Sequence, residues 1–239
     1  MIPWSRGIRR KEPQVVREES IVQSNTILAK ATMAAIAGVA WFALALQLFL
    51  MIRDSDPGGM ATLHAVVNYL SFFTILTNLL VAVGLSFRFS FSESRVGRFL
   101  LRPAAQSATA VYIAVVGIIY ALLLRHLWNP QGAQKLADVL LHDVVPVTYG
   151  LFWLVFVPKT TLRWRDSIQW LAYPVLYMAY TLVHGALSGW YPYYFIDVRA
   201  IGLPHVLKNA SAMLVCFIFM ALIFVAVGRW VTRPAPETT

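Results

Sequence analysis

Long apolar runs, separated by short polar segments, constrain this chain more than any other feature of its sequence. A helix needs about 20 apolar residues to cross the hydrocarbon core of a bilayer, and each run is about that long. The runs predict an all-α membrane protein: a bundle of six transmembrane helices within residues 27–230, with tails at 1–26 and 231–239. They cover residues 27–51, 64–87, 103–125, 135–158, 168–189 and 203–228.

Composition and charge support a membrane protein and exclude other classes. Only 13% of the residues are charged, too few to cover a soluble globule of this size. The formal net charge of +9 comes from clusters at the ends of apolar runs, so it does not predict nucleic-acid binding. The single cysteine, Cys216, provides no disulfide framework. We expect the lipid bilayer to be the main partner, and nothing in the sequence indicates a cofactor.

The basic residues also predict the orientation. With the N-terminus inside, 15 of the 20 Lys and Arg residues fall on inner segments. The other five are Arg53, Arg125, Lys135, Arg199 and Lys208. Inner loops of membrane proteins carry an excess of Lys and Arg, so we expect a multi-pass protein with both termini cytoplasmic (N-in/C-in).

Polar residues within the runs share helix faces. On an ideal helix, one face of the second run carries His64, Asn68, Ser71, Thr74 and Asn78. The fourth run groups Asp138, His142 and Tyr149, with Pro146 one turn after His142. The fifth and sixth runs contribute Tyr173, Tyr177, Tyr180, His184, His205 and Asn209. Polar groups are costly in hydrocarbon, so we expect these faces to converge on one pocket in the outer half of the bilayer.

His142 is the most informative of these residues, because Asp138 lies one turn before it and Asp143 beside it. An ionisable group at this depth usually has a function. The outer loop 189–195 holds five aromatic residues. This loop fits either an interfacial aromatic belt or a lid over the pocket, with Asp197 and Arg199 to pin it.

Three segments carry a resemblance to a known family: residues 69–80 (YLSFFTILTNLL), 141–146 (LHDVVP) and 189–198 (GWYPYYFIDV), followed by Asn209. They resemble the bacterial six-helix membrane proteins of the Pr6Pr family over nearly the whole chain. That family is similar, more distantly, to the androgen-induced membrane proteins, which hydrolyse fatty acid esters of hydroxy fatty acids with an intramembrane threonine and histidine. The resemblance implies a place in the bacterial cell membrane.

The resemblance assigns the histidine to His142 and leaves two hydroxyls for the nucleophile, Ser71 and Thr74. It implies a lipid-ester substrate, attacked by one of these hydroxyls after His142 accepts its proton. Asp138 or Asp143 would orient the imidazole, as in a catalytic triad. Asn68 or Asn78 would stabilise the oxyanion. We expect the remaining polar residues to bind substrate: Tyr149, His184, His205 and Asn209.

Other functions fit the same polar pocket. A transporter, a sensor or a non-catalytic membrane partner would also place polar groups inside a bundle. A metal or haem site could draw on His64, His142, His184, His205 and Asp138. No two of these histidines have the close spacing of a metal motif, so we predict no metal.

Overall fold

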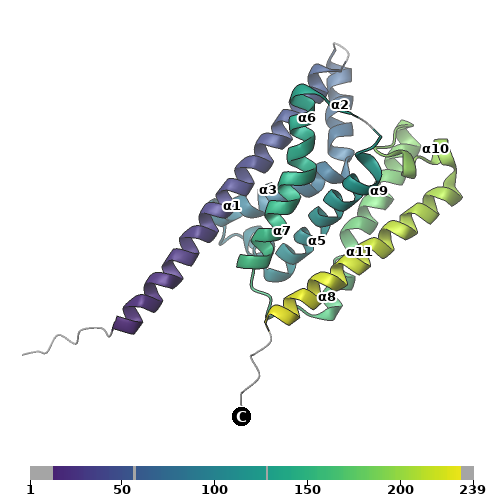
Figure 1. Ribbon diagram of the computed structural model, residues 1–239. Coiled ribbons are helices and arrows are strands. Elements are labelled where there is room, and N and C mark those ends of the chain that lie inside the picture. Colours follow the sequence, from purple (N-terminus) through teal and green to yellow (C-terminus); the bar gives the residue numbers. More distant parts are fainter. Residues whose placement is uncertain (1–12, 56–57, 128, 233–239) are drawn as a thin grey trace, which may run out of the picture.

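The computed structural model describes residues 13–55, 58–127 and 129–232, and all regular structure within them is helical (Figure 1). Most of the two expected tails, residues 1–12 and 233–239, lies outside the described residues. The elements are α1 (Pro13–Arg53), α2 (Gly59–Ser71), α3 (Phe73–Ser90), α4 (Arg95–Leu100), α5 (Pro103–Ile119), η1 (Tyr120–Leu124), α6 (Gly132–Val139), η2 (Leu140–Val144), α7 (Val145–Phe156), α8 (Trp164–Gln169), α9 (Ala172–Ser188), η3 (Tyr194–Ile196), α10 (Val198–Ile201) and α11 (Leu203–Val231).

Five segments of the described chain are long and apolar enough to cross a membrane: Thr26–Arg53, Phe73–Ser90, Pro103–Leu124, Gly132–Phe156 and Leu203–Val231. The fifth apolar run, expected over residues 168–189, is divided by a turn at Trp170 and Leu171. Its longer part, α9, has 17 residues. At 1.5 Å per residue α9 is about 26 Å long, a little short of the roughly 30 Å hydrocarbon core.

The distribution of side chains is that of a protein dissolved in lipid. Large apolar side chains cover the outside, with Leu187 84% and Val155 68% exposed. Polar Thr77 and Asn78 are completely buried inside the bundle. Hydrocarbon favours this arrangement and water opposes it, so the chain is an integral membrane protein.

The bundle has two distinct ends. The first described residues of α1 and the last of α11 lie at one end (Figure 1). At the opposite end α1 finishes and α2, α6 and α11 begin (Figure 1). We call this the Asp54 end, because Asp54 follows the last residue of α1 there. Between the ends, the small buried Ala40 and Ala43 of α1 belong to one core with Val81 and Ala82 of α3.

Three of the long helical paths depart from regular α-helix: two are interrupted part-way along, and the third ends in a π-helical turn. Phe72 has extended backbone angles, φ −78° and ψ 129°, and separates α2 from α3. The other two are π-helical turns: η2 lies between α6 and α7, and η1 ends the path of α5. Pro146 follows η2 and has no N–H to give to the carbonyl of His142 one turn back. Irregular backbone at membrane depth is tolerated where it faces protein or a cavity, and π turns are frequent at functional sites.

Candidate functional site

A cavity of about 550 Å³ lies inside the bundle, among α1, α3, η1, α6, η2 and the aromatic loop, residues 189–195. We call it the polar cavity. It reaches Asp54 and Leu127 at the Asp54 end and extends inward to His142. Along α6 and η2, the eight steps from Gln134 to His142, at about 1.5 Å each, give it a depth of about 12 Å. Its polar wall residues are Gln47, Asp54, Thr74, Tyr120, Gln134, Asp138, His142 and Tyr193.

Tyr120, Asp138 and His142 form a cluster in the wall of the polar cavity. The imidazole Nδ1 of His142 lies 2.9 Å from the carbonyl oxygen of Asp138 and 3.2 Å from its carboxyl Oδ1. The Tyr120 hydroxyl donates a hydrogen bond to Oδ2 of the same carboxyl group. The Tyr120 ring stacks on the imidazole, with 4.0 Å between centroids and 17° between planes. The two π turns therefore bring Tyr120 and His142 into direct contact.

These contacts fix the imidazole in one tautomer. A carbonyl oxygen can only accept a hydrogen bond, so in the neutral ring Nδ1 carries the proton. Nε2 then keeps its lone pair and can act as a base. Asp138 is 4% exposed, and within the described residues its Oδ1 has no hydrogen-bond partner, despite its nearness to Nδ1. A buried acceptor without a partner is costly, which is typical of a functional site.

Asp143, the other candidate to orient His142, pairs with a different side chain. Arg125 donates to Oδ1 of Asp143, and both side chains are partly exposed. The same guanidinium lies 5.1 Å from the centre of the Tyr120 ring. Asp138 is therefore the carboxyl group that contacts the imidazole, and Arg125 covers the outer face of Tyr120.

Thr74 lies in the first turn of α3, just after the break at Phe72. It is 8% exposed and lines the polar cavity together with His142. Its backbone N–H donates to the Tyr193 hydroxyl oxygen over 3.4 Å, and its own hydroxyl is 3.5 Å from that oxygen.

Ser71, the alternative hydroxyl, does not line the polar cavity. It is completely buried, donates to the carbonyl of Val67 over 2.8 Å, and lies 2.7 Å from the hydroxyl of Tyr180 on α9. The prediction that Ser71 and Thr74 share one face assumed that the second apolar run forms one continuous helix. The extended backbone of Phe72 breaks that helix and separates the two side chains.

Asn78 connects the two sides of the polar cavity. Its side-chain nitrogen donates to the carbonyl of Thr74 over 2.9 Å and to the carbonyl of Leu141 over 3.2 Å. Leu141 directly precedes His142, so one buried amide fixes α3 relative to η2. An amide has two N–H donors, and both are used here, so Asn78 acts as a positioning residue.

Tyr149 and Asn209, both predicted in the pocket, form structural hydrogen bonds instead. The Tyr149 hydroxyl donates to the carbonyl of Gln106 on α5 over 3.4 Å, and the residue is 3% exposed. Asn209 donates to the carbonyl of Phe195 over 2.8 Å and so ties α11 to the aromatic loop. Neither residue lines the polar cavity, and the hydrogen bonds described here tie them to α5 and to the aromatic loop.

Asn68, His184 and His205 also lie outside the polar cavity. Asn68 is half-buried on α2, beyond the break, and His205 is exposed near the start of α11. The His184 ring stacks on Tyr180 with 5.7 Å between centroids. The expected convergence of four helices on one pocket is therefore wrong for these residues. The break at Phe72 separates Asn68 from α3, His184 packs against Tyr180 within α9, and His205 lies on the exposed surface of α11.

The aromatic loop forms a fixed wall of the polar cavity. Trp190 and Tyr193 pack edge-on against the Phe72 ring, with centroids 5.5 Å and 5.7 Å away. Arg199 donates to the carbonyl of Gly189 over 2.5 Å, while the Asp197 carboxyl caps α10. The loop thus covers the helix break, and burial raises the pKa of the Tyr193 phenol, which stays protonated at neutral pH.

Several wall residues were not identified from the sequence. Tyr120 stands alone among apolar neighbours, so no face pattern marks it. Gln134 donates to Gln47 over 2.8 Å and brings α1 into the wall. For Tyr120 and Gln47, their placement inside apolar runs was the only available signal, and Gln134 lies just before a run.

Two further findings concern alternative functions. Within the described residues, no group of three or more His, Cys, Asp or Glu side chains could hold a metal ion. Beyond Asn78, the side chains of Val81, Ala82 and Leu85 are completely or almost completely buried in the core. This packing does not favour a polar path through the bundle.

The fold and the cavity define an integral membrane protein built from apolar helices around a buried polar site. The chain is 32% identical over 129 residues to Protein yop1 of Emericella nidulans, a match that covers 53% of this chain and 70% of that protein. By this similarity the chain belongs to the family of yop1. No family model matches the chain, and no solved structure matches it.

Proposed function

We propose that this protein is an intramembrane hydrolase of lipid esters, with Thr74 as nucleophile and His142 as general base. One observation carries the proposal: Thr74 and His142 come from different helices and line the same cavity of about 550 Å³. The Tyr120–Asp138–His142 cluster supports it, because Nδ1 is held as the donor and Nε2 is left as the base. His142 and a hydroxyl at Ser71 or Thr74 are also what the more distant similarity to the androgen-induced membrane hydrolases implies.

The proposed reaction has two steps. The Thr74 hydroxyl oxygen attacks the ester carbonyl while its proton passes to Nε2 of His142, and the C–O bond to the alcohol breaks as Nε2 returns that proton to the leaving oxygen. Water then attacks the acyl-threonine ester, giving its proton to Nε2. The free carboxylic acid leaves, and Thr74 regains its proton. Asp138 stabilises the imidazolium that forms in both steps.

Tyr193 is the best-placed group to stabilise the oxyanion. Its hydroxyl oxygen lies 3.5 Å from the Thr74 hydroxyl, so a tetrahedral carbon bound to Thr74 would form beside it. The phenol is protonated at neutral pH because burial raises its pKa. A donor already held in place at this position lowers the barrier, since it needs no rearrangement during the reaction.

The proposal includes six membrane crossings with both termini cytoplasmic. The first described residues of α1 and the last of α11 lie at the same end of the bundle, which requires an even number of crossings (Figure 1). The five long apolar segments give an odd number, so α9 would provide the sixth crossing. The polar cavity would then open on the outer side.

The test is turnover of a panel of lipid esters and labelling with a fluorophosphonate probe in detergent-solubilised protein. We expect Thr74→Val and His142→Ala to lower turnover by about 10³-fold or more, with folding retained. Thr77→Val is the matched control: it lies on the same helix, is buried and does not line the cavity. This variant and Ser71→Ala should keep most of the activity. Wild-type protein that neither hydrolyses nor labels, or labelling that survives Thr74→Val, would overturn the proposal.

A further inference from the structure

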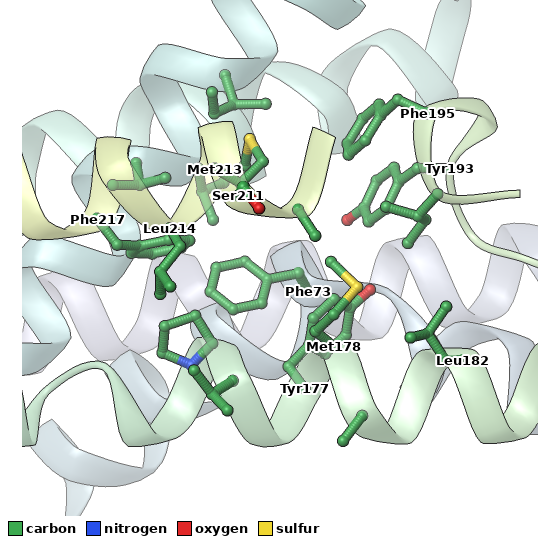
Figure 2. A pocket seen from close by; sticks show the side chains of 18 of the residues that line it. Phe73, Tyr177, Met178, Leu182, Tyr193, Phe195, Ser211, Met213, Leu214 and Phe217 are labelled. Carbon is green, nitrogen blue, oxygen red and sulfur yellow. The ribbon is translucent and has the colours of Figure 1, made fainter. Parts of the chain in front are cut away.

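A second cavity, of about 390 Å³, also has Thr74 in its wall and lies among α3, α5, α9, α11 and the aromatic loop (Figure 2). We call it the apolar cavity. Its side chains are almost all apolar, and Figure 2 shows Phe73, Met178, Leu214 and Phe217 around it. Val175 and Leu207 in its wall are 49% and 51% exposed, so the cavity borders the lipid-facing surface between α9 and α11.

The few polar groups in this wall already have partners. The Tyr177 hydroxyl donates to the carbonyl of Ser71 over 3.0 Å, and the Ser211 hydroxyl to the carbonyl of Leu207 over 2.9 Å. The Thr74 hydroxyl faces that of Tyr193. A wall with its polar groups satisfied internally suits an occupant without hydrogen-bonding groups.

The apolar cavity and the polar cavity meet at shared residues. Thr74, Leu124 and Tyr193 line both of them. A molecule that crosses this junction would place a polar part near His142 and an apolar part between α9 and α11. Its middle would lie at the Thr74 hydroxyl.

We infer that the apolar cavity binds the acyl chain of the substrate, so that the ester carbonyl lies at Thr74 and the alcohol part lies in the polar cavity. The inference rests on the proposed hydrolase and assigns a position to each half of its substrate. The chain enters sideways from the bilayer, past Val175 and Leu207. The substrate class is therefore an ester with a long acyl chain.

The apolar cavity contributes more to placing the ester carbonyl at Thr74 than to the affinity for the substrate. An acyl chain that leaves the bilayer exchanges one apolar environment for another, so it gains little hydrophobic free energy. Filling the cavity instead holds the carbonyl at the distance that attack requires. A displacement of about 1 Å can cost roughly 10²-fold in rate.

Ala210→Trp tests the inference, because Ala210 lines the apolar cavity and a tryptophan there would fill it. Ala212→Trp is the matched control: it lies on the same helix but is exposed and outside the wall. We expect Ala210→Trp to lower kcat/KM by about 10²-fold for a palmitoyl ester. Turnover of the matching acetyl ester should hardly change, and Ala212→Trp should leave both esters unaffected. Equal losses for both esters, or no loss for either, would overturn the inference.

A binding measurement separates this inference from the proposed hydrolase. Thr74→Val protein is exposed to palmitate that carries a photoreactive diazirine, and the adducts are located by mass spectrometry. We expect adducts at cavity residues such as Met178 and Leu214, abolished by Ala210→Trp and kept in Ala212→Trp. If these adducts are found and the wild-type protein nevertheless hydrolyses no ester, the proposed hydrolase activity is refuted but acyl binding in the apolar cavity is not. Adducts confined to outward-facing residues, or cavity adducts that survive Ala210→Trp, would refute acyl binding in the apolar cavity.

Discussion

The hydrogen bond from Tyr120 to Asp138 is the most informative contact to remove. Tyr120→Phe deletes only the donor hydroxyl and keeps the aromatic ring, which stacks on His142. The Asp138 carboxyl is 4% exposed, so water cannot easily replace the lost donor. Its other oxygen has no hydrogen-bond partner within the described residues. The variant would therefore leave a buried carboxyl group with neither oxygen satisfied.

The expected loss of stability is about 2 kcal/mol, because hydrogen bonds to a charged acceptor contribute roughly 1.5–3 kcal/mol. Tyr69→Phe provides the control. Its hydroxyl donates over 2.8 Å to the carbonyl of Leu44, a neutral acceptor, at a site that is also 4% exposed. Hydrogen bonds of this kind inside membrane proteins average about 0.6 kcal/mol. Tyr120→Phe should thus cost several times as much as Tyr69→Phe.

The free energy of unfolding can be measured by titration with a denaturing detergent from mixed micelles. The variants Tyr120→Phe, Asp138→Asn and their combination form a double-mutant cycle, in which we expect a coupling energy of about 1.5 kcal/mol or more. A coupling energy near zero, or equal losses for Tyr120→Phe and Tyr69→Phe, would refute the idea that Tyr120 stabilises a charged Asp138.

Two further predictions concern the loop at each end of the bundle. A side-chain carbon at Gly185 would overlap the Tyr191 ring, whereas one at Gly150 would meet nothing within 4 Å. Gly185→Ala should therefore destabilise the protein by about 1–3 kcal/mol and Gly150→Ala should not, measured by thermal exposure of Cys216 to a thiol-reactive dye. Lys159 donates to the carbonyls of Trp153, Leu154 and Val157 over 2.7–2.9 Å, and burial lowers its pKa. The unfolded chain therefore binds the proton of Lys159 more tightly than the folded chain does. The free energy of unfolding should then rise with pH in the range just below the ordinary lysine pKa. Lys159→Met should remove that rise. A variant whose free energy of unfolding depends on pH as the wild type's does would contradict this role of Lys159.

The class of protein could be predicted from the sequence because its cause is local. An apolar run long enough to span hydrocarbon forms a helix whatever its neighbours do, since no water is present to satisfy its backbone. The clustering of Asp138 and His142 was also local, because residues four apart meet on any helix. Their contact in the structure, 3.2 Å between Nδ1 and Oδ1, agrees with that pattern.

The remaining site residues depended on where helices deviate from ideal geometry. A face drawn at 100° per residue placed Ser71 with Thr74, but the extended Phe72 separates them. The two π turns bring Tyr120 against His142, and no pattern in the third apolar run marks that tyrosine. Such interruptions depend on how several helices pack together, and a single run does not contain that information.

Sequence alone is enough to predict that the chain lies in a membrane, where its apolar runs fall, and that a histidine and an aspartate share a face within one of them. The packing of the helices shows which hydroxyl shares a cavity with that histidine, which carboxyl group contacts it, and that a second, apolar cavity adjoins Thr74. Helix formation follows from neighbouring residues and the solvent, whereas a cavity forms between segments that are distant in sequence.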